Sequence, residues 1–211
     1  MVEHEKVLAF LQQHRDEFPT WAGSEAARQH RELFISTAAA FSQHYNINNA
    51  RYTFLSLASL VRKTESFALE PALGSDFFDE LKEQLASETL TADNAALVSK
   101  YLQPALAHLT MAQAIGELGF SLNGQALELN IYRPDNSNSK ESDPGLQRLL
   151  DMKQEQALED GERYLRRLRK LLNESASATR YATYFNSSVY EQPAGPENYT
   201  TATTSPVFGA M

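Results

Sequence analysis

Apolar residues recur at helical spacing along most of the chain and predict a mainly α-helical protein. A first short segment of this kind stops near Pro19. Ser24 is a suitable N-cap for a second helix, which is expected to carry Leu33 and Phe34 on its apolar face and to end near Asn46. Further helices are predicted to start at about Asn49, Ser75 and Thr91. Together these segments predict a helical bundle.

Two prolines fall within this pattern. Pro71, with Gly74 shortly after it, is expected to end the helix that starts near Asn49. Pro104 lies inside the longer segment that runs from Thr91 toward Gly119. A kink is expected at Pro104, because proline lacks an N–H group and its ring clashes with the preceding helical turn.

The last helix has a strong start signal. Asp143 can cap it and Pro144 suits its first position, after which apolar residues recur at helical spacing up to about Asn173. At a rise of ~1.5 Å per residue, such a helix would be about 45 Å long.

Between these two long helices, residues 120–131 alternate apolar and polar positions and predict one β-hairpin. Asn123 and Gly124 are a preferred pair for its turn, since both tolerate positive φ. One face of the hairpin would then be apolar, with Phe120, Leu122, Leu127, Leu129 and Ile131. This face could pack on the protein's own core or join a neighbouring subunit, and the sequence leaves both interpretations open.

We expect the chain to divide into three parts, of which the last differs from the others in composition. Residues 1–48 form an N-terminal helical extension, residues 49–174 a helical core that includes the hairpin, and residues 175–211 a tail rich in Ser, Thr, Ala and Pro. Aromatic residues punctuate this tail and could anchor it to its own domain or to a partner, although its composition also suits disorder. The aromatic candidates for partner binding are Tyr184, Phe185, Tyr190, Tyr199 and Phe208.

Composition narrows the class of protein. The 211 residues are 42% apolar and 22% charged, with a net charge of −8 and no cysteine. A chain of this size can bury a core, and its acidity disfavours tight wrapping around nucleic acid. No apolar run is long enough to cross a membrane and no signal peptide is recognised, so we expect a protein made in a cytoplasm.

The sequence carries no pattern of catalytic, cofactor-binding or metal-binding residues. Its five histidines form neither zinc-protease nor di-iron helix signatures, and no nucleophile elbow or nucleotide-binding loop occurs. Basic residues crowd the end of the last helix, where they could complement the helix dipole or contact DNA or an acidic partner. These residues are Arg163, Arg166, Arg167 and Lys170.

Four stretches follow one another around the predicted hairpin. They are FLSLASLVRKTESFALEPALGSDFFDELKEQL, LVSKYLQPALAHLTMAQAI, ALEDGERYLRRLRKLLNESA and YFNSSVY. In this order they resemble an uncharacterised family found in tailed bacteriophages and prophages of gut bacteria, most closely at EPALGSDFFDEL. That family is similar in architecture to head–tail connectors, also called adaptors or head-completion proteins, and the resemblance covers about residues 50–190.

The resemblance implies a virion structural protein without enzymatic activity or cofactor. Such a subunit assembles with copies of itself into a ring, commonly twelve-fold, beneath the portal protein, and contacts tail or ring proteins while DNA passes through without sequence-specific binding. It would reside at the neck of the virion, and in the host cytoplasm during viral assembly. A cytoplasmic helical adaptor that binds a protein or peptide partner is the alternative.

Overall fold

The structure is a computed structural model that describes residues 7, 10–11, 14, 16–22, 24, 27, 32–118, 121–123, 126–128 and 144–193. Its helices before the strands are α2 Pro19–Ala22, α4 Ala38–Ser42, α5 Arg51–Thr64, η1 Glu65–Leu69, α6 Glu70–Leu73, α7 Ser75–Ser87, α8 Ala92–Leu97, η2 Val98–Leu102 and α9 Gln103–Leu118. After the strands come α10 Pro144–Ser175 and α11 Ala182–Phe185. The prediction of a mainly helical protein is therefore confirmed.

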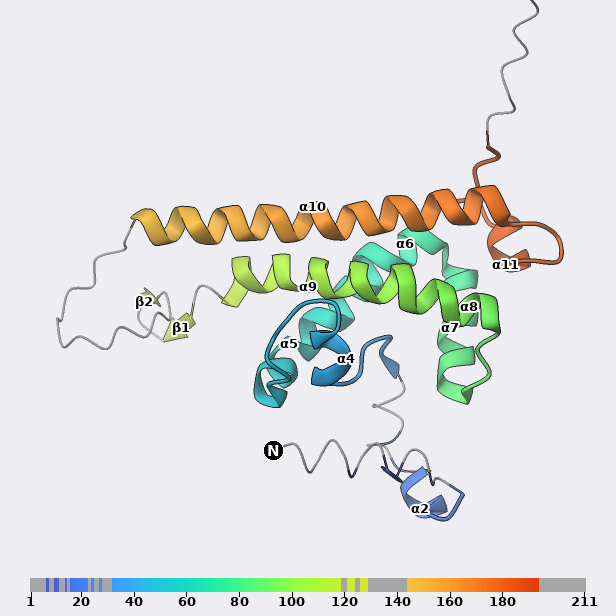
Figure 1. The fold of residues 1–211 in the computed structure, drawn as a ribbon, viewed down its shortest axis with the longest axis horizontal. Helices are drawn as coiled ribbons and strands as arrows, with labels where there is room; N and C mark the ends of the chain where they lie inside the picture. The colour runs from blue at the N-terminus through green and yellow to red at the C-terminus, as the bar shows by residue number, and fades with distance from the viewer. Residues whose placement is uncertain are drawn as a thin grey trace, which may run out of the picture.

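The body of the protein is built around two long helices, α9 and α10, which lie side by side (Figure 1). Gly161 on α10 permits their close approach, because a Cβ atom there would lie 2.6 Å from Cγ of Leu109 on α9. Helix α5 packs against α9, α4 packs on α5, and α11 packs on α7. The largest fully buried side chains include Ile35, Phe41, Leu69, Phe77, Leu102, Leu106, Leu168 and Tyr184.

Both prolines that the sequence analysis singled out lie in continuous helical backbone. The π-helical turn η1 comes just before Pro71 and η2 just before Pro104. In each turn an N–H group donates five residues back, from Glu70 to Glu65 and from Gln103 to Val98, which inserts one extra residue into the helix. The end of the first helix, predicted at Pro71 and Gly74, therefore falls at Gly74, whose φ is 78°, and the helix continues past Pro71.

The prediction of one continuous helix from Ser24 to about Asn46 is wrong in the middle of that range. Leu33, Phe34 and Ile35 form a bend that is buried in the core, and the helix after them, α4, spans only Ala38–Ser42 with Thr37 as its N-cap. The backbone groups of Phe34 bond to side chains from distant helices, so helical hydrogen bonding is replaced by tertiary contacts.

The β-hairpin predicted over 120–131 is wrong as an element of the fold. Among the described residues, two three-residue strands pair antiparallel, β1 Ser121–Asn123 and β2 Ala126–Glu128, with Asn123 opposite Ala126. A two-stranded ribbon of this length is only marginally stable by itself. The core that the described side chains form comes from the helices and the segments that connect them. Over the described residues the molecule is a helical protein, and a hairpin is not a second building block of its core.

Candidate functional site

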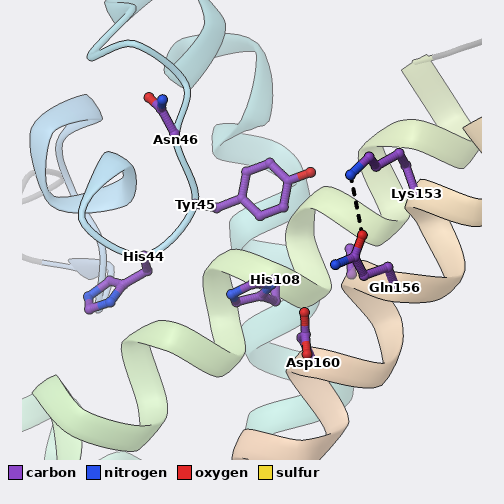
Figure 2. A pocket seen from close by; sticks show the side chains of 8 residues that line it. His44, Tyr45, Asn46, His108, Lys153, Gln156 and Asp160 are labelled. Atoms are coloured by element: carbon purple, nitrogen blue, oxygen red, sulfur yellow. Dashed lines mark hydrogen bonds between the residues drawn. The ribbon is translucent and has the colours of Figure 1, made fainter.

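A pocket of about 290 Å³ opens between α9, α10 and the segment that follows α4. Figure 2 shows Tyr45 reaching from that segment toward α10, with His108 of α9 beside Asp160 of α10. Lys153 donates a hydrogen bond to Gln156 Oε1 at 3.3 Å on the α10 side. The lining residues are His44, Tyr45, Asn46, His108, Lys153, Gln156, Ala157 and Asp160.

His108 is the central side chain of this pocket. Its ring meets Tyr45 edge-on at 5.5 Å between centroids and stacks on Tyr164 at 5.9 Å. Burial lowers the pKa of His108, and the carboxylate of Asp160 opposes this shift only in part. Burial also lowers the pKa of His44, against a hydrogen bond with Gln103. Both imidazoles are therefore neutral at pH 7.

One nitrogen of His108 has no hydrogen-bond partner. Its Nδ1 atom is buried, and none of the described groups bonds to it. The pocket thus offers a neutral imidazole, a carboxylate, an ammonium group and a phenol, but its lining contains no Ser, Thr or Cys nucleophile. Within the described ranges no group of three or more His, Cys, Asp or Glu residues could hold a metal ion. This arrangement suits the binding of a small polar group.

The predicted basic residues all lie exposed on α10. Arg163 pairs with Glu159 at 2.8 Å, and Arg166 with Glu162 at 3.3 Å. Lys170 approaches Glu174 at 3.8 Å. Such exposed pairs within one helix contribute about 0.3–0.5 kcal/mol each. No described residue pairs with the fourth cation, Arg167, so most of the cluster's charge is balanced within α10 itself.

The same helix exposes large apolar side chains. Leu149 is 50% exposed and Met152 is 59% exposed, one turn apart near the N-terminal end of α10. Leu158 is 45% exposed further along the helix. The inner side of α10 packs on α9, α6 and η2, and its outer side carries these apolar groups together with the charged residues. We call Leu149, Met152 and the four predicted cations the outer face of α10.

The predicted aromatic residues of the tail have different surroundings. Tyr184 is fully buried, meets Phe77 edge-on, and donates a hydrogen bond to Asn173 Oδ1 at 2.8 Å. Phe185 and Tyr190 are half-buried with their ring centroids 4.9 Å apart. The structure thus places Tyr184 in the core of its own chain rather than on an exposed surface for a partner.

Several predicted site residues cannot be compared with the structure. Gly124, Leu129, Ile131, Tyr199 and Phe208 lie outside the described residues, and so do the side chains of Leu122, Asn123 and Leu127. The structure therefore does not test whether these side chains contact a partner.

A second cluster was missed by sequence reasoning. Glu65 is buried, accepts a hydrogen bond from the Phe34 N–H group at 2.8 Å, and pairs with Lys82 at 2.5 Å. Burial raises the pKa of Glu65 against the effect of Lys82, and burial lowers the pKa of Lys82 against the effect of Glu65. On a helical wheel these two residues look like ordinary surface charges, and their pairing depends on how α7 packs beside η1.

A family model described as a family of unknown function, DUF6712, matches residues 69–194, which is more than half of the chain. The protein belongs to this family. No curated protein and no solved structure gives a significant match. In the part of the chain that the structure describes, no helix is both long enough and apolar enough to cross a membrane.

Proposed function

We propose that this member of the DUF6712 family is a virion structural protein without enzymatic activity, a head–tail connector subunit that forms a ring with other copies at the portal vertex. The observation that carries the proposal is the outer face of α10, where exposed Leu149 and Met152 precede a run of charged residues on a helix of 32 residues. Exposed apolar groups that gather on one helix mark surfaces that other chains cover.

The resemblance to an uncharacterised phage family that is similar in architecture to connectors suggests what those chains are, and the composition agrees with it. In this role α9 and α10 form a stiff wedge, and the outer face of α10 contacts the next subunit. The net charge of −8 suits a channel along which DNA slides without sticking. Tail residues Tyr199 and Phe208 dock on the portal or on an adjacent ring protein.

Reconstitution with the portal protein of the same phage tests this function. Purified protein is mixed with portal rings and imaged by electron cryomicroscopy, and we expect a ring of additional density beneath the portal. Replacing Leu149 and Met152 together by glutamate should abolish the ring, because charge would then be buried at the subunit interface. Phe67→Glu is the matched control, since Phe67 is 74% exposed on a different element, η1.

The tail is tested separately by ending the chain at residue 194. A shorter chain that ends near Asn173 would also remove Tyr181 and Tyr184 from the core and would confuse binding with stability. We expect the chain that ends at residue 194 to fold and to bind the portal more weakly. Absence of the full-length protein from the portal would contradict the connector role, and unchanged portal binding by the shortened chain would contradict the role of the tail.

A further inference from the structure

The buried bend at Leu33–Ile35 is held by side chains that bond to its backbone. The Phe34 N–H group donates to Glu65 Oε1 at 2.8 Å, and Gln103 Nε2 donates to the Phe34 carbonyl oxygen at 2.7 Å. Both polar groups of one residue are thus satisfied by two different helices, one at each π-helical turn. This satisfaction allows an irregular backbone segment to lie in the core.

Lys82 of α7 completes the contacts around this segment. Its Nζ atom donates to the Glu32 carbonyl oxygen and to Glu65 Oε2, both at 2.5 Å, and lies 4.4 Å from the centre of the Phe34 ring. The Phe34 ring also meets Phe78 edge-on at 5.7 Å. We call the group Glu65, Phe78, Lys82 and Gln103 the clamp, and the chain before residue 37 the arm.

The clamp has the features of a site that recognises a short peptide segment. Hydrogen bonds to main-chain groups provide affinity, and a seat for one aromatic side chain provides specificity. All four clamp residues lie between positions 65 and 103, well after the arm in the sequence. The same contacts would form if the arm came from another copy of the chain. Exchange of arms between two copies would therefore keep all of these hydrogen bonds and ring contacts.

The arm before the clamp leaves apolar surface uncovered. Val7 is 54% exposed, Phe10 is 49% exposed and Phe18 is 39% exposed, and the Phe10 and Phe18 rings meet each other at 6.1 Å. Figure 1 shows α2, which follows Phe18, set apart from the α9–α10 pair. Directly after the arm, Thr37 has an extended backbone, with φ −133° and ψ 154°, and could act as the hinge.

We propose that the clamp is an intersubunit latch, which in the assembled protein takes residues 32–36 of a neighbouring copy. Each arm then crosses to the next subunit, where its apolar residues are covered as well. This inference rests on the self-assembly that the proposed function requires, but not on the portal. Exchange of an identical segment is a route to assembly that needs no new surface.

Crosslinking of isotopically mixed protein tests the latch without any mutation. Heavy and light chains are unfolded together, refolded, assembled, and treated with a carbodiimide, which joins carboxylates to nearby lysines. Glu32 lies at the surface, and Lys82 Nζ donates a hydrogen bond to its carbonyl oxygen. Burial lowers the pKa of Lys82, and the nearby negative charge of Glu32 is among the effects that oppose this shift. If arms are exchanged at random, about half of the Glu32–Lys82 crosslinks should join a heavy to a light peptide.

The Glu65–Lys82 crosslink is the internal control, because both residues belong to the clamp of one chain and should never mix isotopes. A chain that stays monomeric by light scattering at the crosslinking concentration would overturn the latch, and so would Glu32–Lys82 crosslinks of a single isotope only. Mixed crosslinks without portal binding would retain the latch and remove the connector role. Portal-bound rings with single-isotope crosslinks would retain the connector role and remove the latch.

A variant pair gives a second measurement. Gln103→Ala removes the donor to the Phe34 carbonyl group, so the arm should leave its clamp more readily. Heavy and light assemblies that are mixed after refolding should then form mixed Glu32–Lys82 crosslinks faster. Gln113→Ala is the matched control, since Gln113 lies on the same helix, is also half-buried, and bonds to Thr64 instead. Equally fast mixing of isotopes in both variants would contradict the latch.

Discussion

Two segments of this protein share a sequence pattern but continue differently as helices. LEPALG, residues 69–74, and LQPALA, residues 102–107, each follow a π-helical turn and place their leucines in the core. The first helix ends at Gly74, whereas the second continues to Leu118 as α9. The last residue of the pattern accounts for the difference, because glycine adopts the positive φ that ends a helix and alanine favours continuation.

The two segments also differ in what their π-helical turns present. The first turn opens with Glu65, a buried carboxylate, and the second opens with Val98, a buried apolar residue. Glu70 precedes Pro71 and makes no described contact with the arm. Gln103 precedes Pro104 and bonds to Phe34. Both π-helical turns accommodate a proline, but they bond to Phe34 through different groups. Glu65 at the first turn accepts from the Phe34 N–H group, and Gln103 after the second turn donates to its carbonyl oxygen.

The largest effect is expected from Glu65→Ala, which leaves Lys82 without its carboxylate partner and the Phe34 N–H group without an acceptor. Loss of one partner of a buried ion pair should lower the free energy of unfolding by about 3–5 kcal/mol. Urea unfolding followed by circular dichroism measures it. Val98→Ala at the equivalent position should cost only about 2 kcal/mol, through lost apolar burial.

Equal losses of stability in the two alanine variants would contradict the proposed difference between the two π-helical turns. Replacing Glu65 and Lys82 together by methionine tests whether the unpaired charge causes the loss. This double variant keeps the volume of both side chains and leaves no charge buried, so it should be more stable than Glu65→Ala.

Gly74→Ala tests the residue that ends the first helix. Its φ of 78° with ψ of 145° is a conformation that only glycine adopts easily, and a Cβ atom would lie 3.1 Å from Val189 Cγ2. We expect a loss of about 1–3 kcal/mol, seen as a lower melting temperature. Gly116→Ala is the control, because its Cβ atom would meet only the flexible end of Gln154. A control that is destabilised as much would show that φ is not the cause.

Gln103→Glu makes the second segment resemble the first. A carboxylate cannot donate to the Phe34 carbonyl oxygen, so two acceptors would face each other at neutral pH at a cost of about 1–2 kcal/mol. Protonation of the new carboxyl restores a donor, so stability relative to the wild type should recover as the pH falls. Glu70→Gln, the reciprocal change, should leave the melting temperature unchanged at either pH.

The smallest expected effect is the dependence of folding stability on pH. His108 and His44 both have a pKa below the usual value of 6.5, so the unfolded chain takes up protons at a higher pH than the folded chain does. Stability should therefore fall as the pH drops from 6.5 toward the folded pKa values, and then level off. His108→Phe keeps the ring contacts with Tyr45 and Tyr164 and should weaken this dependence. An unchanged pH profile in the variant would assign the effect to other groups.

Local signals along the chain determine much of the helical framework. Ser75 does begin α7, Thr91 caps α8 through its side chain, and the apolar spacing after Pro144 does form one long helix. Gly74 ends its helix as expected. These features depend on residues within one or two turns of each other, so periodicity and capping chemistry suffice to find them.

Of the sites, the sequence located the cations on α10, but neither the pocket around His108 nor the clamp. Both of these assemble residues that are far apart in the chain, and neither His108 nor Glu65 carries a local signal of its surroundings. The repeat of LEPAL and LQPAL could have indicated that both prolines are accommodated alike, but not that Gln103 reaches Phe34.

The amino-acid sequence by itself determined a mainly helical chain, where its strongest helices begin and end, and an acidic, cysteine-free composition. Only the tertiary structure decided that Leu33–Ile35 leaves the helix, that Tyr184 enters the core, and that Glu65 pairs with Lys82. The reason is that local preferences amount to a few tenths of a kcal/mol per residue, whereas burial and hydrogen bonding to distant groups amount to several times more.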